Sequence, residues 1–269
     1  MRDNLSILLL SCDKYIDVVR KNLEFLDKYW SKCPYDIYIG VESAQLEYNG
    51  ELKIHMLHFN GAFWSERVMN HLRALSADNV LIILDDFFVE ECVNEDIIDE
   101  AYDLLVGDKR IANVVFAHIS GEKDETKMQS VFECRVKKSL SLLNWQIGIW
   151  RKDALLALMQ SDENPWQSEI YGSLRARYLS DYEFYCIDSD LHMPLVYGRG
   201  WLIVRGKWNS NEIERLEEKC EIEINPENRP VEPIKTIPAT LWSRVNIRLS
   251  LIKYQLRLIV MSSKRRKNL

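Results

Sequence analysis

Residues 1–120 alternate short apolar runs with stretches of helical periodicity, and no other feature limits the fold as strongly. The apolar runs are residues 5–10, 36–43, 52–59, 79–86 and 111–119, and the helical stretches are residues 14–30, 64–77 and 94–106. Strands that alternate with helices form a mostly parallel sheet with helices on its faces. The sequence therefore predicts an α/β fold.

Two of the helical stretches also carry signals for their ends. Ser65 is a candidate N-cap for the first, because a Ser hydroxyl can accept a hydrogen bond from the opening turn. Asn94 is the equivalent candidate for residues 94–106, and Gly107 stands just beyond that stretch, where glycine is common.

The second half of the chain is less regular. Residues 121–130 (GEKDETKMQS) predict an exposed loop, and residues 142–150 (LLNWQIGIW) form an apolar, aromatic segment. A helix is expected at 152–160, followed by the turn-rich stretch 162–170. Residues 192–208 are typical of a strand or hairpin bounded by glycines.

Polar groups stand where three of the predicted strands end. They are Ser11 to Asp13, Glu42 and Ser43, and Asp85 and Asp86. In open sheets of parallel strands, ligands bind in the crevice at the carboxyl ends of the strands. We therefore expect these side chains to converge on one crevice.

Asp85 and Asp86 directly follow the buried run 80–84. Mg²⁺ typically takes one or two carboxylates together with substrate phosphates, whereas unpaired carboxylates are costly to bury. An Asp-Asp pair can also simply start a turn, and this pattern alone leaves both readings open. Phe87 and Phe88 are expected to pack under the turn, and Glu90 and Glu91 to be solvated loop charges.

Composition narrows the class of protein. The 269 residues are 47% hydrophobic and 28% charged, as in an ordinary globular protein, and the net charge of −6 argues against a general nucleic-acid binder. The six cysteines form no CxxC pair, so we predict free thiols in a reducing cytosol. The apolar run at 5–10 is too short for a signal peptide, and no run of about 18 apolar residues predicts a transmembrane helix.

Six segments between residues 5 and 208 carry a resemblance through their order and spacing. They are LSILLLSCDKY, GAFWSERVMNHL, LDDFFV, NWQIGIWRKDAL, ENPWQSE and VRGKW. Together they resemble GT-A nucleotide-sugar glycosyltransferases, and more narrowly a bacterial group that assembles capsule and O-antigen polysaccharides. That group has Asp-Asp-Phe-Phe where the usual motif is Asp-x-Asp. The resemblance implies a GT-A fold, with a Rossmann-like, mostly parallel central sheet flanked by helices.

The resemblance also implies a donor site. Its residues would be Ser11, Asp13 and Glu42 around the nucleotide, Arg67 and Lys207 toward the diphosphate or sugar, and Asp85 toward the ribose or the metal. Asp85, Asp86 and His192 would hold Mn²⁺ or Mg²⁺, with Asp86 as the direct ligand. Arg205 alternates with Lys207, so on a strand the two would share a face.

For the acceptor half, the resemblance implies Glu169 as the base that takes a proton from the acceptor hydroxyl. Glu163 and Asp162 are the next candidates, and a helix-dipole role is the alternative for Glu169. Trp145, Gln146 and Trp166 are the expected acceptor-binding residues, because sugar faces stack on aromatics and amides bind hydroxyls. Trp150 could join them or belong to the core.

The C-terminal part differs in composition. Residues 1–224 would form the transferase domain, with a donor half up to about residue 120 and an acceptor half from 121 to 224. Residues 225–238 contain four prolines and predict a linker. Residues 239–269 predict a basic amphipathic helix, which suits an anionic membrane surface. Packing on the domain or on another subunit is the alternative.

The expected function is therefore that of a metal-dependent, inverting hexosyltransferase. It would move a sugar from a UDP-sugar to a lipid-linked oligosaccharide or polysaccharide acceptor, at the inner face of the cytoplasmic membrane. Two alternatives remain: a non-catalytic, membrane-associated carbohydrate- or nucleotide-binding module, and a nucleotidyltransferase on a similar sheet. The latter usually has a Gly-rich phosphate loop after the first strand, which SCDKY lacks. Homo-oligomer formation stays open.

Overall fold

The computed structural model describes residues 4–139, 141–198, 202–233, 254–256 and 258. Within these, a large sheet has the strand order β3-β2-β1-β4-β8-β5-β9-β7-β6, and a small sheet has the order β10-β11-β12. The large sheet consists of β1 (Leu5–Leu10), β2 (Ile37–Val41), β3 (Ile54–His58), β4 (Asn79–Leu84), β5 (Ile111–Val115), β6 (Lys123–Gln129), β7 (Phe132–Arg135), β8 (Gly148–Arg151) and β9 (Glu183–Ile187).

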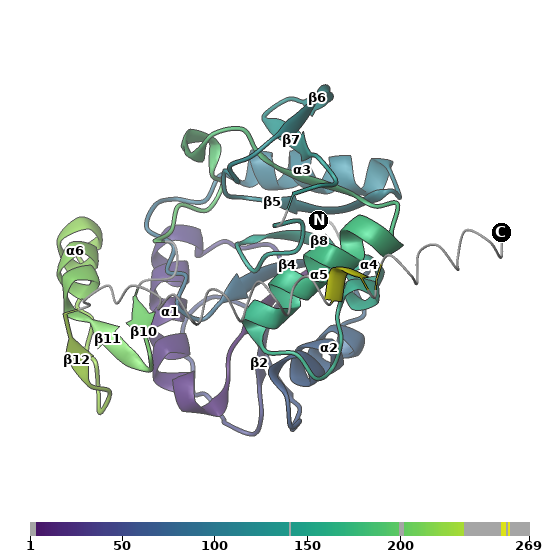
Figure 1. Ribbon diagram of the computed structural model, residues 1–269. Helices are drawn as coiled ribbons and strands as arrows, with labels where there is room; N and C mark the ends of the chain where they lie inside the picture. The colour runs from purple at the N-terminus through teal and green to yellow at the C-terminus, as the bar shows by residue number, and fades with distance from the viewer. Residues whose placement is uncertain (1–3, 140, 199–201, 234–253, 257, 259–269) are drawn as a thin grey trace.

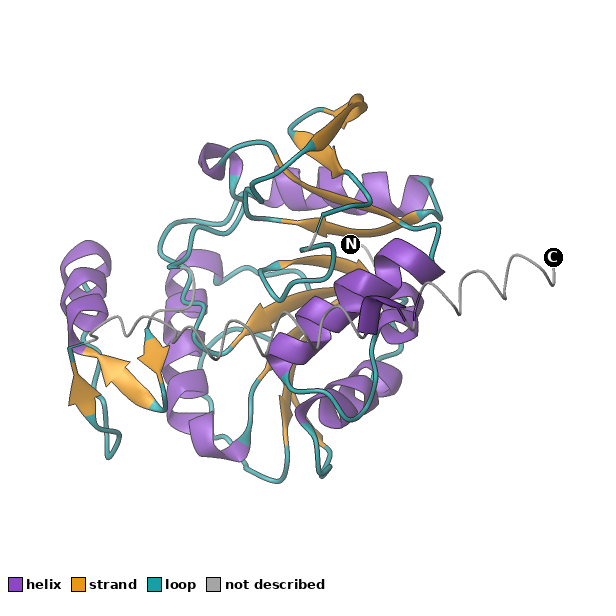
Figure 2. Cartoon of the chain, viewed as in Figure 1, coloured by secondary structure: helices purple, strands orange, loops and turns teal. Residues whose placement is uncertain are grey.

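The helices and the small sheet complete the described fold (Figure 2). The helices are α1 (Ile16–Trp30), α2 (Trp64–Ala74), α3 (Glu95–Gly107), α4 (Lys152–Leu158), α5 (Pro165–Leu179) and α6 (Ser210–Cys220), with short 3-10 turns η1 (Asp13–Tyr15) and η2 (Asp190–His192). The small sheet consists of β10 (Ile203–Val204), β11 (Lys207–Asn209) and β12 (Val231–Glu232).

Both faces of the central strands are covered by helices. On β4, Leu81 and Ile83 belong to the core beneath α1 and α3, whereas Val80 and Ile82 belong to the core beneath α2, α4 and α5. Successive side chains of a strand point to opposite faces, so a strand covered on both sides is apolar at every position. The predicted α/β fold, with a mostly parallel central sheet flanked by helices, is confirmed.

Strand β8 runs antiparallel between β4 and β5. Its first residue, Gly148, pairs with Ile82 near the end of β4, so the loop before β8 lies at the same sheet edge as Asp85 and Asp86. A Cβ at Gly148 would stand 2.6 Å from the carbonyl oxygen of Val114, which explains the glycine. This reversal brings the segment that precedes β8 to the carboxyl edge of the parallel strands.

The small sheet and α6 pack on the outer side of α1 (Figure 1). Val18 and Phe25 of α1 share this core with Phe88, Trp208 and the apolar side of α6. The ring centroids of Phe25 and Phe88 are 4.8 Å apart. Phe88 therefore anchors the turn after β4 to this second core, and Phe87 is buried on the first, so the expected packing of both rings is confirmed.

Two local predictions are wrong. Ser65 is not the N-cap of α2: Phe63 holds that position, and Ser65 is buried, with its N–H donating to the carbonyl of Glu163 at 3.1 Å. Residues 121–130 are not a loop throughout, because β6 pairs with β7 at the edge of the sheet. Polar edge strands lack the apolar alternation by which strands are recognised. The Asn94 cap is confirmed, since its side chain accepts from the N–H of Asp96.

The described C-terminal residues contact the domain. In the stretch predicted as a linker, β12 pairs with β11. The predicted basic helix lies outside the described residues except for 254–256 and 258, which are helical. Here the Tyr254 ring stacks on Tyr171 at 4.3 Å, its hydroxyl lies 2.7 Å from Arg175 Nη1, and Leu258 is buried. No helix in the described ranges has the length and apolarity to cross a membrane.

Candidate active site

The polar ends of β1, β2 and β4 lie together, as the sequence predicts. Ser11 Oγ donates to Asp85 Oδ2 at 2.6 Å, which joins the end of β1 to the end of β4. Glu42, after β2, accepts from the backbone N–H of Asp13 at 2.6 Å and pairs with Arg67 Nε at 3.1 Å. Five predicted donor residues therefore form one polar cluster at the carboxyl edge of the sheet.

Asp13 holds the ends of β1 and β2 together. Its carboxylate accepts the backbone N–H groups of Glu42, Ser43 and Ala44 at 2.8–3.0 Å, and the Ser43 hydroxyl at 2.6 Å. Slight burial acts to raise the pKa of Asp13, but these hydrogen bonds outweigh it and lower the pKa to about 2. Asp13 is thus fully engaged in joining the ends of β1 and β2.

Asp85 and Asp86 form an acidic pair that has no direct ion-pair partner among the described residues. Desolvation raises the pKa of both carboxyl groups, and for Asp85 the neighbouring charge of Asp86 raises it further. No Lys or Arg among the described residues forms an ion pair with either. Two adjacent desolvated carboxylates with no direct ion-pair partner suit a hard divalent cation such as Mg²⁺ or Mn²⁺.

His192 is not brought to this pair. Its Nδ1 lies 2.6 Å from Asp188 Oδ1, on the turn after β9. Across the described ranges, no three His, Cys, Asp or Glu side chains are grouped closely enough to hold a metal ion. The described residues therefore do not group His192 with Asp85 and Asp86, and His192 is bonded instead to Asp188.

Asn22, for which no role was predicted from the sequence, fixes the backbone of the turn after β4 that contains Asp85 and Asp86 (the acidic turn). It is fully buried on α1, and its side-chain amide donates to the carbonyls of Asp85 and Phe87 at 3.0 and 3.1 Å. These two carbonyls flank Asp86. A buried Asn within the apolar face of a helix is the signal that could have identified it.

We expect Asn22→Leu to lower both stability and nucleotide affinity. The change removes both donors and leaves the buried carbonyl of Phe87 and the partly buried carbonyl of Asp85 without them, and an unpaired buried carbonyl costs about 1–3 kcal/mol. Urea unfolding measures the first effect and calorimetric titration with UDP and Mn²⁺ the second. Asn211→Leu, at an exposed position, is the control. A destabilised variant with unchanged affinity would show that Asn22 does not position the pair.

The candidate base lies beside the loop that precedes β8. Glu169 Oε1 accepts the backbone N–H of Trp145 at 2.9 Å, and burial raises the pKa of Glu169 while that hydrogen bond opposes the rise. Tyr197 links this loop to the acidic turn: its hydroxyl bonds Gln146 Oε1 at 3.0 Å, and its ring centroid is 4.8 Å from that of Phe87.

The other carboxylates proposed as bases differ in environment. Glu163 is buried and forms a two-pronged ion pair with Arg175, at 2.7 Å for each contact. This ion pair fixes Glu163 next to the start of α5, whose N-cap is the adjacent Asn164. Asp162 is exposed. Of the three, only Glu169 is both partly buried and free of a cationic partner among the described residues.

The aromatic residues expected at the acceptor differ in burial and in the contacts that they make. Trp150 is buried in β8 against Phe184, so it belongs to the core. Trp145 is only 3% exposed, with its Nε1 donating to Ser168 Oγ at 2.8 Å, and offers no ring face to a sugar. Trp166 is 71% exposed at the start of α5, and Gln146 is partly exposed. Trp166 and Gln146 remain the acceptor candidates.

The basic residues near β11 are also arranged differently from expectation. Lys207 pairs with Glu232 across the small sheet. Arg205 lies in the turn between β10 and β11, with φ at 53°, so it does not share a strand face with Lys207. Arg229 lies in the stretch predicted as a linker, and no role for it was predicted from the sequence.

Arg229 attaches the C-terminal segment beside the acidic pair. Its Nε and Nη2 donate to the Asp17 carboxylate at 2.8 and 2.6 Å, and the guanidinium carbon lies 4.4 Å from the centroid of the Tyr15 ring. Its charge acts against the rise in the pKa of Asp85. Arg229 is thus a nearby positive charge, held in place by α1.

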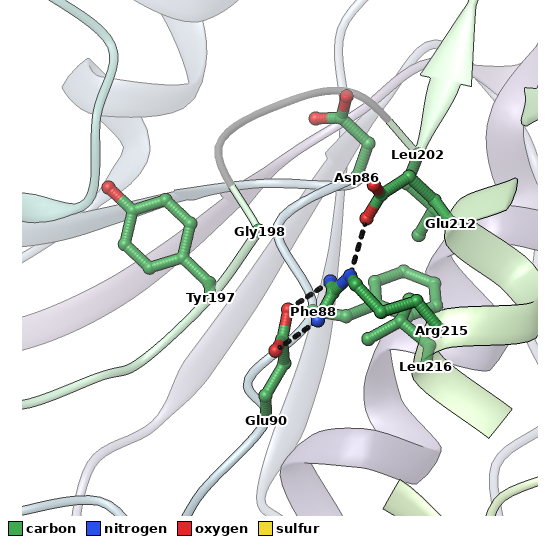
Figure 3. Close-up of a pocket in the computed structure, with 9 residues that line it drawn as sticks. All are labelled: Asp86, Phe88, Glu90, Tyr197, Gly198, Leu202, Glu212, Arg215 and Leu216. Carbon is green, nitrogen blue, oxygen red and sulfur yellow. Dashed lines mark hydrogen bonds and ion pairs between the residues drawn. The ribbon is translucent and has the colours of Figure 1, made fainter. Parts of the chain in front are cut away.

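A cavity of about 270 Å³ opens next to Asp86, between the acidic turn and α6 (Figure 3). Glu90 lies at its base and is not a solvated loop charge: it is 5% exposed, and Arg215 binds both of its carboxylate oxygens at 2.7 and 2.8 Å. The expectation of a solvated Glu90 was wrong because its partners lie on α6, far along the chain. Glu91 is exposed, as expected, and pairs with Lys219.

Known proteins give limited comparisons. No family model matches this sequence, and no curated protein sequence is similar to it. Among solved structures, S. aureus TarS residues 1–349 has a TM-score of 0.39 at 14% identity, covering 68% of this chain and 60% of that chain. The same protein in complex with UDP gives 0.40 at 14% identity, with the same coverage.

The galactosyltransferase LgtC, in complex with donor and acceptor sugar analogues, gives a TM-score of 0.39 at 10% identity, over 64% of this chain and 69% of that chain. The chain thus spans less than two thirds of the TarS fragment. At these scores the similarity carries no conclusion about function.

Proposed function

We propose that this protein is a glycosyltransferase that uses a UDP-sugar and a divalent metal ion. The observation that carries the proposal is the acidic pair. Two desolvated carboxylates with no direct ion-pair partner among the described residues stand at the carboxyl edge of a mostly parallel sheet, where ligands of such folds bind. A divalent metal ion would supply positive charge to this pair, and an anionic nucleotide diphosphate would be held through that ion.

The donor side of the site is built around β1 and β2. Ser11 is bonded to Asp85, and Glu42 holds Arg67 at the start of α2. In this arrangement Glu42 and Ser11 border the nucleotide, and Arg67 faces the diphosphate or the sugar. Asp85 and Asp86 would hold the metal ion, which when bound neutralises the charge that develops on the leaving diphosphate.

Glu169 is the proposed base. Its ionised carboxylate takes the proton from an acceptor hydroxyl, and the oxygen of that hydroxyl bonds to the anomeric carbon as the bond to the diphosphate breaks. A single displacement of this kind inverts the anomeric configuration. The hydrogen bond from the Trp145 N–H orients the carboxylate, and partial burial raises its pKa toward the range useful for a base.

Donor turnover tests the activity. The protein is incubated with a panel of UDP-sugars, UDP-galactose and UDP-glucose first, with Mn²⁺ or with a chelator, and UDP release is measured. We expect release from at least one donor, with Mn²⁺ only. Absence of both turnover and UDP binding across the panel would leave the non-catalytic carbohydrate-binding module as the better account.

The acceptor is proposed to be a glycan carried on a lipid at the inner face of the cytoplasmic membrane, reached through the basic segment 239–269. Tyr254 itself contacts Tyr171 and Arg175 of α5, which favours packing on the domain as the alternative role. Co-sedimentation with anionic liposomes, using the full chain and a chain ending at residue 233, separates the two roles. Equal binding by both would remove the membrane role.

A further inference from the structure

The cavity beside Asp86 has a polar wall, formed by ion pairs that join Glu90 to Arg215 and Glu212 of α6. Arg215 lies between Glu90 and Glu212, with Nε 2.8 Å from Glu212 Oε2 (Figure 3). Lys219 adds a second cation at 3.2 Å from Glu90. Burial acts to raise the pKa of Glu90, but the hydrogen bonds and charge of Arg215 and Lys219 lower it overall. The buried Glu90 thus fixes Arg215, and Arg215 fixes Glu212 at the cavity.

Gly198 also lines the cavity and lies close to these ion pairs. A Cβ at this position would meet Arg215 Nη2 at 3.0 Å and Glu90 Oε1 at 3.2 Å, with Glu212 Oε2 at 3.8 Å. A side chain would therefore enter the space next to the ion pairs. Close approach to these side chains, and not a positive φ, is therefore the feature that suits a glycine here.

The remaining lining is apolar and aromatic. Phe88, Leu202, Leu216 and Tyr197 supply it. Asp86 and Glu212 disfavour an anion, while carboxylates and a guanidinium together can accept from and donate to hydroxyl groups. A volume of about 270 Å³ is at the lower end for small-molecule sites and suits a single ring. These features match a neutral, hydroxylated ring with one apolar face.

We propose that this cavity is a subsite for one sugar ring, with Glu212 and Arg215 as its hydroxyl-binding groups. The inference rests on the proposed function for its place in the reaction, since Asp86 belongs to both sites. Two sources of the ring share this chemistry: the sugar carried by the UDP donor, and the terminal sugar of the acceptor. Glu90 acts through Arg215 and is a positioning residue.

Glu212→Gln tests the subsite, with Glu214→Gln, at an exposed position of the same helix, as the matched control. Affinity for UDP, affinity for the UDP-sugar, and KM for the acceptor are measured for both. A donor-sugar subsite predicts a loss of roughly 10-fold or more in UDP-sugar affinity with UDP affinity unchanged. An acceptor subsite predicts a similar rise in acceptor KM alone. No change in any of the three overturns the proposal.

The subsite can also be tested if the proposed function fails. If the wild-type protein binds no UDP, methyl glycosides of glucose and galactose are titrated and followed by saturation-transfer NMR. Binding that Glu212→Gln and Gly198→Ala both weaken, and Glu214→Gln does not, supports a sugar subsite in a binding module. Absence of binding to the wild-type protein in that case overturns it.

Discussion

Asp86→Asn is expected to lower sugar transfer on the order of 10³-fold or more and to remove its dependence on Mn²⁺. The change takes one carboxylate from the pair that would hold the metal ion, and charge stabilisation by such an ion is worth several kcal/mol. The fold is expected to persist, because the two desolvated carboxylates repel each other and the change removes one of these like charges. Steady-state rates at several Mn²⁺ concentrations measure the effect.

Asp153→Asn, on the exposed side of α4, is the control for Asp86→Asn. It should keep the wild-type rate and the wild-type response to Mn²⁺. A thermal melt of each variant without metal separates a lost ligand from a lost fold. If Asp86→Asn transferred sugar at the wild-type rate with the same response to Mn²⁺, the acidic pair would have no part in catalysis.

Glu169→Gln is expected to lower transfer by about 10²–10⁴-fold while donor binding stays intact. The amide keeps an oxygen for the Trp145 N–H but cannot take a proton. Glu163→Gln is the informative comparison, because Glu163 is engaged with Arg175: we expect it to lower stability far more than it lowers the rate per folded molecule. If Glu163→Gln instead lowered the rate strongly, and Glu169→Gln lowered mainly stability, Glu163 would be the base and Glu169 the structural residue.

The same base predicts a pH dependence. Glu169 must be ionised to accept a proton, so the rate should fall as the pH drops through its pKa. Burial raises that pKa above the ordinary value for Glu, although the Trp145 N–H opposes the rise, so the fall should begin at a higher pH than for an exposed Glu. Profiles of kcat/KM at saturating Mn²⁺ measure it, and the acidic limb should vanish in Glu169→Gln.

The elements predicted from the sequence are those with a strong local pattern. Strands β1 and β4 are mostly apolar runs, and the polar residues that follow them predicted the polar cluster at the sheet edge. The antiparallel insertion of β8 could not be predicted, because pairing between distant strands leaves no local signal. Helix α6 was missed although Ile213, Leu216 and Cys220 recur at helical spacing after the Asn209 cap, so its signal was present in the sequence.

The site residues also divide into those with a local sequence signal and those whose role depends on distant partners. Asp85, Glu42 and Arg67 could be placed because each follows a strand or opens a helix. Glu90 and Asn22 could not, since what each does depends on partners far along the chain: Arg215 lies 125 positions from Glu90, and the carbonyl of Phe87 lies 65 positions from Asn22. Burial by a distant segment turns an apparently solvated charge into a fixed structural one.

The acidic pair is proposed to hold a metal ion against a nucleotide diphosphate. Calorimetric titration of the 269-residue protein with UDP, in Mn²⁺ and in EDTA, is the sharpest test of this role. We expect binding that is at least roughly 10-fold tighter with Mn²⁺ for the wild-type protein, and no such gain for Asp86→Asn. Absence of UDP binding under both conditions, or an equal gain in the variant, would contradict it.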